Sequence, residues 1–342
     1  MNILLIYTGG TIGMKQDPHT LALTPFDFSQ IVKEVPELKK FGYRIDSITF
    51  DPPRDSSDIE PDFWCGLAEM IRDNYEKYNG FVVLHGTDTM SYTASALSFM
   101  LDNLEKPVIL TGSQLPIGML RTDGKENLIS AIEIAAACDI DGHAIVPEVC
   151  IFFQNELYRG NRTTKYNAEN FHAFISPNYP LLAETGVHVK YNERNVLRPS
   201  VWGKKLIVNN VFDTNVAILK IFPGISATVI DSVMATPGLR ALIIETYGTG
   251  NAPTKEWFLG PIRRAVESGV IILNVTQCLS GQVDMDAYAT GVTLKKCGVI
   301  SGSDITVEAA LAKLFFLLGQ SSDISSIKTE LTKNLRGEIA SL

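Results

Sequence analysis

Residues 2–13 read Asn2-Ile-Leu-Leu-Ile-Tyr7 and then Thr8-Gly-Gly-Thr-Ile-Gly13, at the start of a chain of 342 residues. The first six form a short apolar run without alternation, which is typical of a strand buried on both faces of a parallel sheet. The glycine-rich segment predicts a turn at the carboxyl end of that strand, where open α/β sheets bind their ligands. Gly9 and Gly10 would let the backbone approach a ligand closely.

Similar apolar runs, rich in valine and isoleucine, recur along the chain between segments of helical period. The further predicted strands are Phe81–Leu84, Val108–Leu110, Glu148–Phe153, Val216–Ile221, Ala241–Glu245 and Val270–Val275. Helices are predicted over Ser91–Leu101 and Thr306–Leu318, with Thr306 as the cap and Gly319 ending the second helix. The alternation predicts an α/β fold with parallel strands.

The length of the chain exceeds that of a typical single core, so two domains are expected. Between about Pro177 and Asn210 the pattern loses its period and gathers Pro, Asn, Arg and Gly. This stretch predicts the domain boundary: an N-terminal catalytic domain at 1–190, a linker at 191–210 and a C-terminal α/β domain at 211–342.

The composition of the chain limits which binding partners and which cellular compartment are expected. The formal charge is −8 and the basic residues are scattered, which gives no footprint for nucleic acid or an anionic membrane. The N-terminus lacks the basic region and the apolar length of a signal peptide, and no span reaches membrane length. Five widely spaced cysteines without a CxxC argue against a disulfide framework. These features favour a cytoplasmic protein.

A second glycine-containing loop, His85-Gly-Thr-Asp-Thr-Met90, follows a predicted strand and precedes a helix. Thr87 and Asp88 would lie near the positive end of that helix, which favours anions. The patterns GxGxxG, GxxxxGK[ST], GxSxG and HExxH are all absent, and the five histidines are isolated. The sequence therefore predicts neither a nucleotide cofactor nor a catalytic metal.

What remains is a hydroxyl nucleophile activated without histidine, for which the chain offers Thr11 and Thr87, with Asp88 and Lys165. A threonine hydroxyl needs a base, and a lysine that loses its charge through burial can serve. Taken singly these residues decide little, because Asp88 could be a helix cap and Lys165 a solvated surface lysine.

Together, the motifs resemble the asparaginase family in order and spacing over nearly the whole chain. The resemblance rests on TGGTIG (8–13), DSSD (55–58), HGTDTM (85–90), TGSQ (111–114), RGNRTTK (159–165), FPGIS (222–226), YGTGNAP (247–253) and TQCLSG (276–281). The cytoplasmic, type I branch is the most similar. The resemblance implies a larger N-terminal domain, a smaller C-terminal domain, and a homodimer or dimer of dimers with active sites between protomers.

The resemblance also implies roles for single residues in the hydrolysis of L-asparagine. Thr11 matches the family nucleophile, and Thr87, Asp88 and Lys165 match its second catalytic group. The positions that match substrate-binding positions, or whose amides are candidates to bind the oxyanion, are Gly10, Asp55, Ser56, Ser57, Gly86 and Asn251, together with Thr87 and Asp88.

Two departures from the family pattern affect mechanism and regulation. Many relatives carry a tyrosine on the flap after the first motif, whereas Met14–Pro25 contains none. Tyr288 is expected either to supply that hydroxyl from a neighbouring protomer or to be a packed interface residue. Some type I relatives bind a second asparagine beside an arginine where this chain has Glu245, so no strong activation by asparagine is predicted.

Three alternatives stay open at this stage. An amidase that prefers glutamine would have the same motifs, because rejecting one methylene depends on pocket shape. The asparaginase-like subunit of a transfer-RNA amidotransferase normally has an extra N-terminal domain, for which the position of Thr8 leaves no room. A non-catalytic amino-acid sensor would keep the fold, but the joint presence of the threonines, Asp88 and Lys165 speaks against it.

Overall fold

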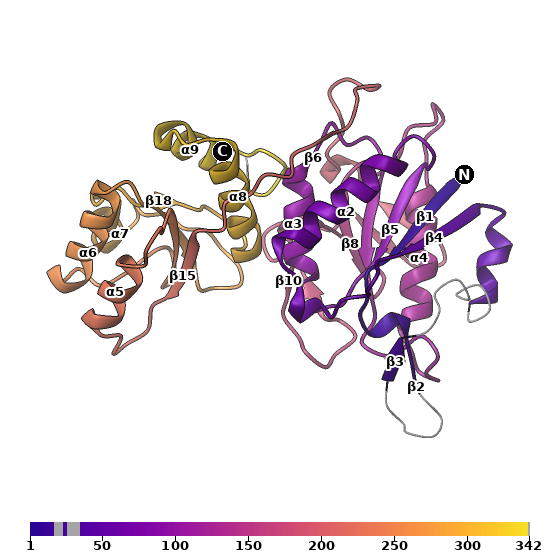
Figure 1. Ribbon diagram of the computed structural model, residues 1–342, viewed down its shortest axis with the longest axis horizontal. Helices are drawn as coiled ribbons and strands as arrows, with labels where there is room; N and C mark the ends of the chain where they lie inside the picture. Colours follow the sequence, from indigo (N-terminus) through magenta and orange to yellow (C-terminus); the bar gives the residue numbers. More distant parts are fainter. Residues whose placement is uncertain (17–22, 26–34, 341–342) are drawn as a thin grey trace. The chain divides into compact units, whose positions relative to one another are not determined.

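The computed structural model describes residues 1–16, 23–25 and 35–340 (Figure 1). The chain divides into two compact units, Met1–Asn210 and Val211–Leu342. Each unit is a sheet covered by helices, so the predicted α/β fold is confirmed. None of the helices in the described part of the chain combines the length and apolar character that a bilayer crossing requires.

The first unit contains an eight-stranded sheet with the order β13-β12-β9-β8-β7-β5-β1-β4. Its strands are β1 (Asn2–Tyr7), β4 (Arg44–Thr49), β5 (Gly80–Leu84), β7 (Val108–Thr111), β8 (Val149–Phe153), β9 (Glu156–Arg159), β12 (Ala183–Thr185) and β13 (Val189–Tyr191). The five strands from β8 to β4 are parallel, whereas β9, β12 and β13 pair antiparallel. All four strands predicted in this unit are confirmed.

In the part of this unit that the structure describes, three helices cover the sheet, with α2 (Pro61–Asn74) and α3 (Met90–Met100) on one side and α4 (Gly124–Ala136) on the other (Figure 1). Side chains alternate between the faces of a strand, so every second residue of β1 joins the same core as α4. Short elements complete the unit: β2 (Met14–Gln16), β3 (Leu23–Pro25), β6 (Leu101–Asp102), β10 (Thr164–Lys165), β11 (Phe174–Ile175) and β14 (Ile207–Val208).

The stretch from Pro177 to Asn210, which has no regular period, contributes the short strands β12, β13 and β14 to the first unit. β12 and β13 are antiparallel strands of three residues each at the edge of the sheet. Strands this short need no continuous apolar run, because side chains such as those of Glu184 and Lys190 are exposed to solvent. The break between the compact units therefore falls after Asn210.

The second unit contains a parallel sheet with the order β15-β16-β17-β18. Alternate residues of β16 and β17 pack against α5, α6 and α7, and the residues between them pack against α8 and α9. The elements are β15 (Val216–Lys220), β16 (Ala241–Thr246), β17 (Ile271–Thr276), β18 (Ile300–Ser301), α5 (Ala227–Met234), α6 (Glu256–Glu267), α7 (Ala289–Lys296), α8 (Val307–Gln320) and α9 (Ile324–Leu331).

Helix α8 begins as predicted and ends differently. The Thr306 side chain accepts a hydrogen bond from the Ala309 amide, as a cap does. Gly319 does not end the helix, which continues to Gln320. A Cβ at Gly319 would lie 2.1 Å from the Val211 carbonyl oxygen, so this glycine permits close approach of a neighbouring segment. The prediction that Gly319 terminates the helix was therefore wrong.

A buried ion pair attaches the C-terminal segment to α8. Lys313 Nζ lies 2.6 Å from Glu338 Oε1, and both side chains are fully buried. Lys313 also donates to the carbonyls of Leu331 and Lys333, and Glu338 accepts from two backbone amides. Burial lowers the pKa of Lys313, while Glu338 favours its charged form. Loss of either partner would leave a buried charge.

Candidate active site

Four loops of the first unit meet at one edge of its sheet. They follow β4, β1, β5 and β7, which are neighbours in that order and run parallel, so their carboxyl ends lie side by side. These loops contain the motifs at 55–58, 8–13, 85–90 and 111–114. The carboxyl ends of these strands thus bring together residues as far apart in the chain as Thr8 and Gln114.

Glycines let three of these loops approach one another closely. A Cβ at Gly10, whose φ is 84°, would lie 2.5 Å from the Gly86 amide nitrogen. A Cβ at Gly86 would lie 2.4 Å from Ser56 Oγ. A Cβ at either position would force a neighbouring loop to shift, and the positive φ of Gly10 also favours glycine. Thr11 and Thr87 each follow one of the touching glycines, which places the two threonines on either side of this contact.

Lys165 lies at the end of β10 and reaches the loop after β5. Its Nζ donates hydrogen bonds to Thr87 Oγ1 and to Asp88 Oδ1, each at 2.7 Å. The lysine side chain is 18% exposed and the Asp88 side chain 65%. The amine is thus largely withdrawn from water, while the carboxylate faces solvent at the rim of the site. This is the geometry of a hydroxyl linked to a basic group.

The loop after β4 begins the short 3-10 helix Ser56–Asp58, and Asp55 caps it. The Asp55 carboxylate accepts from the amide and the hydroxyl of Ser57, at 2.9 and 2.8 Å. These bonds lower the pKa of Asp55 below its ordinary value, so its carboxylate is ionised at neutral pH. Ser56 is buried, and its carbonyl accepts from Thr89 Oγ1 at 2.6 Å.

Comparison with known proteins matches both units. The family described as "Asparaginase, N-terminal" matches residues 2–197, and "Glutaminase/Asparaginase C-terminal domain" matches residues 215–331. This chain belongs to the asparaginase family. It is 45% identical to L-asparaginase 1 of Escherichia coli K12, over 99% of this chain and 98% of that protein.

Two further relatives extend the comparison. The crystal structure of L-asparaginase I from Vibrio cholerae superposes with a TM-score of 0.89 at 42% identity, covering 99% of each chain. The mouse protein named 60 kDa lysophospholipase is 41% identical over 98% of this chain, which spans 62% of that longer protein. This chain is therefore a homologue of type I L-asparaginases, which are amidohydrolases.

A buried chain of hydrogen bonds supports the loop after β5, and sequence analysis missed it. His85 is fully buried; its Nδ1 lies 2.6 Å from the Gly86 carbonyl and its Nε2 lies 2.9 Å from Thr93 Oγ1. Trp64 Nε1 donates to the same hydroxyl at 3.0 Å. Burial lowers the pKa of His85 to about 4, so the imidazole is neutral. The sequence shows a histidine as the first residue of HGTDTM (85–90), but it does not show which residues that histidine bonds.

The remaining predicted residues belong to the second unit. Asn251 follows β16, and its Oδ1 accepts from Thr290 Oγ1 at 2.5 Å. Tyr288 is the residue before α7, and it is 59% exposed. Glu245 lies in β16, opposite Lys220 in the last residue pair between β15 and β16. The exposed ring of Tyr288 is available to a partner surface.

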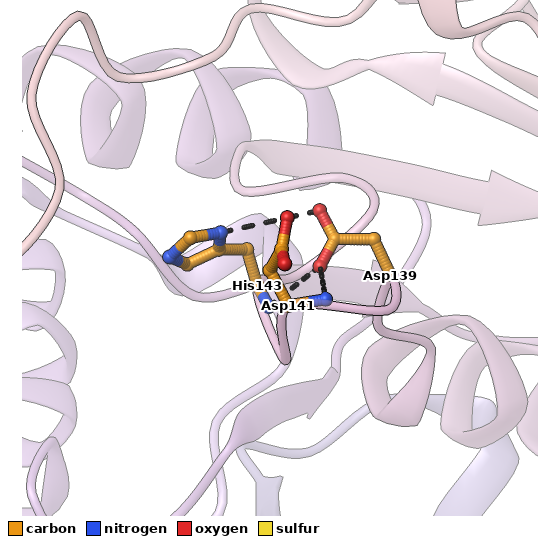
Figure 2. A group of neighbouring side chains, drawn as sticks. All are labelled: Asp139, Asp141 and His143. Carbon is orange, nitrogen blue, oxygen red and sulfur yellow. Dashed lines mark hydrogen bonds and ion pairs between the residues drawn. The ribbon is translucent and has the colours of Figure 1, made fainter.

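One side-chain cluster has donors that a metal ion could use. Figure 2 shows Asp139, Asp141 and His143, whose ligand atoms lie within 4.8 Å of one another. The loop that carries them follows α4 and lines a small cavity with Met1, so it lies at the amino end of β1, opposite the loops of the candidate site. Asp139 Oδ2 already faces Arg198 Nη1 at 3.8 Å, which makes the cluster a poor cation site.

Proposed function

We propose that this chain hydrolyses L-asparagine to L-aspartate and ammonia, with Thr11 as the nucleophile. The observation that supports the proposal most directly is Lys165 Nζ at 2.7 Å from both Thr87 and Asp88, beside the contact between Gly10 and the loop after β5. Membership of the asparaginase family supports the reaction class.

In the proposed first step, Thr11 Oγ attacks the carbon of the substrate's side-chain amide. The C–N bond breaks, and ammonia leaves with the proton that the hydroxyl gave up, which forms a β-aspartyl ester. Water positioned near Thr87 then attacks the ester, and cleavage of the C–O bond returns the hydroxyl to Thr11. Lys165 is the basic group that assists through Thr87.

Backbone amides near Gly10 and Gly86 are the proposed donors to the oxyanion that develops in each step. Because the two loops touch, these amides are held by the fold before substrate arrives. Donors fixed in advance cost no reorganisation during the reaction, and each contributes about 3 kcal/mol in comparable sites.

The substrate's α-amino and α-carboxylate groups are proposed to bind at Asp55, Ser56 and Ser57. An ionised Asp55 suits an ammonium group, and its bonds to Ser57 hold it in one orientation. Thr87, Asp88, Gly10, Gly86 and Asn251 complete the proposed substrate set. The protein is proposed to act in the cytoplasm as a homodimer or a dimer of dimers.

Tyr288 is proposed to contact the nucleophile from a neighbouring protomer, which fits its exposed ring. The Tyr288→Phe variant removes only the hydroxyl. If turnover stays within about twofold of wild type, well under the tenfold that ~1.4 kcal/mol would give, the ring only packs in an interface and the proposal fails.

The first test is steady-state ammonia release from L-asparagine and from L-glutamine. Thr11→Ala is expected to abolish turnover, while Thr329→Ala, whose hydroxyl only bonds its own helix, is the matched control. If ammonia is released faster from L-glutamine than from L-asparagine, L-glutamine replaces L-asparagine as the proposed substrate. Binding of asparagine without turnover by the wild type would instead indicate a sensor.

Two further measurements distinguish the proposed function from a lipase activity and from activation by a second asparagine. Because one relative is named a lysophospholipase, fatty-acid release from lysophosphatidylcholine is measured alongside, and its presence without ammonia release would overturn the proposal. Rate curves for asparagine are expected to be hyperbolic, since Glu245 would repel a second ligand's carboxylate. A sigmoidal curve that Glu245→Ala alters would contradict that part.

A further inference from the structure

Gln114 joins the loop after β7 to the loop that follows Lys165. Its side-chain Nε2 donates to the Ala168 carbonyl at 3.3 Å and to the Asn170 carbonyl at 3.0 Å. Residues 166–173 connect β10 to β11, and Lys165 is the last residue of β10. A single amide group therefore joins the loop after β7 to the segment next to the lysine.

The glutamine itself is held firmly. The Asp123 carboxylate, directly before α4, accepts from the backbone amides of Gln114 and Leu115 at 3.0–3.1 Å. Asn127, on the first turns of α4, donates to the Gly112 carbonyl and to Asp123. The position of the glutamine is thus fixed by a 13-residue helix rather than by a free loop.

The two sides of Lys165 are anchored differently. On its N-terminal side, Arg159 is buried and pairs with Glu148, with Arg159 Nε 2.6 Å from Glu148 Oε2. On its C-terminal side, β10 and β11 share only two residue pairs. The loop 166–173 is shaped by its own short bonds, such as that of the Glu169 amide to Asn167 Oδ1. Two contacts among the described residues tie this loop to the sheet: His172 Nδ1 lies 3.7 Å from Glu156 Oε2 in β9, and Gln114 holds the loop at the carboxyl end of β7.

Packing adds little at this contact. A cavity of about 600 Å³ lies between the two loops, lined by Leu115 and Met119 on one side and by Ala168 and Phe171 on the other. Both acceptors are carbonyls, so only a donor can hold them. The Gln114 amide has both the length and the donor, whereas a glutamate or a methionine has similar length and no donor.

We propose that Gln114 is a positioning residue: it holds the loop 166–173 and so keeps Lys165 Nζ in reach of Thr87 and Asp88. The proposal rests on the proposed function where it concerns turnover. Loss of the amide is expected to lower kcat about tenfold, equivalent to ~1.4 kcal/mol, with little change in KM.

The test compares Gln114→Met and Gln114→Glu with Gln320→Met, a matched control whose amide also donates to a carbonyl, that of Val211, in the second unit. Backbone hydrogen exchange over 164–174 is expected to speed up in both Gln114 variants and to stay unchanged in the control. Unchanged exchange in a folded Gln114 variant overturns the proposal. If Gln114→Glu does not fold, Gln114→Met still gives this readout.

Kinetics separate this proposal from the proposed function. The expected result is a lowered kcat, with the affinity for the product L-aspartate within about twofold of wild type. A kcat equal to wild type, or an affinity for aspartate that falls as much as kcat, overturns a role through Lys165. Absence of turnover in the wild type refutes the proposed function, while the exchange experiment still tests the loop contact.

Discussion

The neutral, buried His85 predicts a specific pH dependence of stability. A carbonyl can only accept a hydrogen bond, so the proton of the imidazole lies on Nδ1, toward Gly86, and Nε2 accepts from the Thr93 hydroxyl. Burial lowers the pKa from 6.5 to about 4 in the folded protein. Between these two values the unfolded chain binds a proton that the folded chain does not.

The sign and size of the pH effect on stability follow from the difference between the folded and unfolded pKa values of His85. Because the folded pKa is the lower one, the neutral histidine adds stability above pH 6.5, and this contribution is lost as the pH falls toward 4. For these two pKa values, lowering the pH from 7 to 5 removes about 2 kcal/mol from the free energy of unfolding of the first unit. The His85→Gln variant has no ionisable group at this position, so the same change of pH should not remove this free energy of unfolding.

The assay is urea unfolding at both pH values in a Trp257→Phe background, where the remaining tryptophans, Trp64 and Trp202, both report on the first unit. Exposed His188 is the control, and His188→Gln should keep the wild-type dependence. If wild type and His85→Gln differ in their pH dependence by less than about 0.5 kcal/mol, the folded protein binds the proton and the argument is refuted.

Three other changes have expected outcomes. Lys165→Met should lower kcat by about two to four orders of magnitude in the ammonia assay, because it removes the proposed base while the fold stays intact by circular dichroism. Gly86→Ala should destabilise the first unit by about 1–3 kcal/mol in urea and raise KM, since the new Cβ meets Ser56 Oγ at 2.4 Å. Glu338→Gln should cost the second unit ~3–5 kcal/mol in urea unfolding, because it leaves the Lys313 ammonium buried without its counter-charge; a loss under about 1 kcal/mol would contradict this.

The central strands could be predicted because both of their faces are buried, which demands continuous apolar runs. β1 and β5 are buried over nearly their whole length and were found from sequence. β4 was not among the predicted strands. It lies at the edge of the sheet, with Arg44, Ser47 and Thr49 exposed, and its composition resembles that of a loop.

The candidate site was partly visible for a similar reason. Loops after parallel strands must meet at one edge, so the loops of Thr11 and Thr87 could be placed together from sequence. The approach of Lys165, 77 positions away from Asp88, came only from the family resemblance. The supports of the site, His85 and Gln114, could not be predicted, because their partners depend on tertiary contacts between distant segments.

The contact between Gly10 and Gly86 also limits how this site can evolve. Every codon change that replaces a glycine adds at least a Cβ, and at these two positions that atom would overlap the backbone or side chain of a neighbouring loop. Any substitution at these two positions therefore has to displace a neighbouring loop and costs stability. New substrate preferences would have to arise around the rim, at residues such as Ser57, while the point where the loops touch stays unchanged.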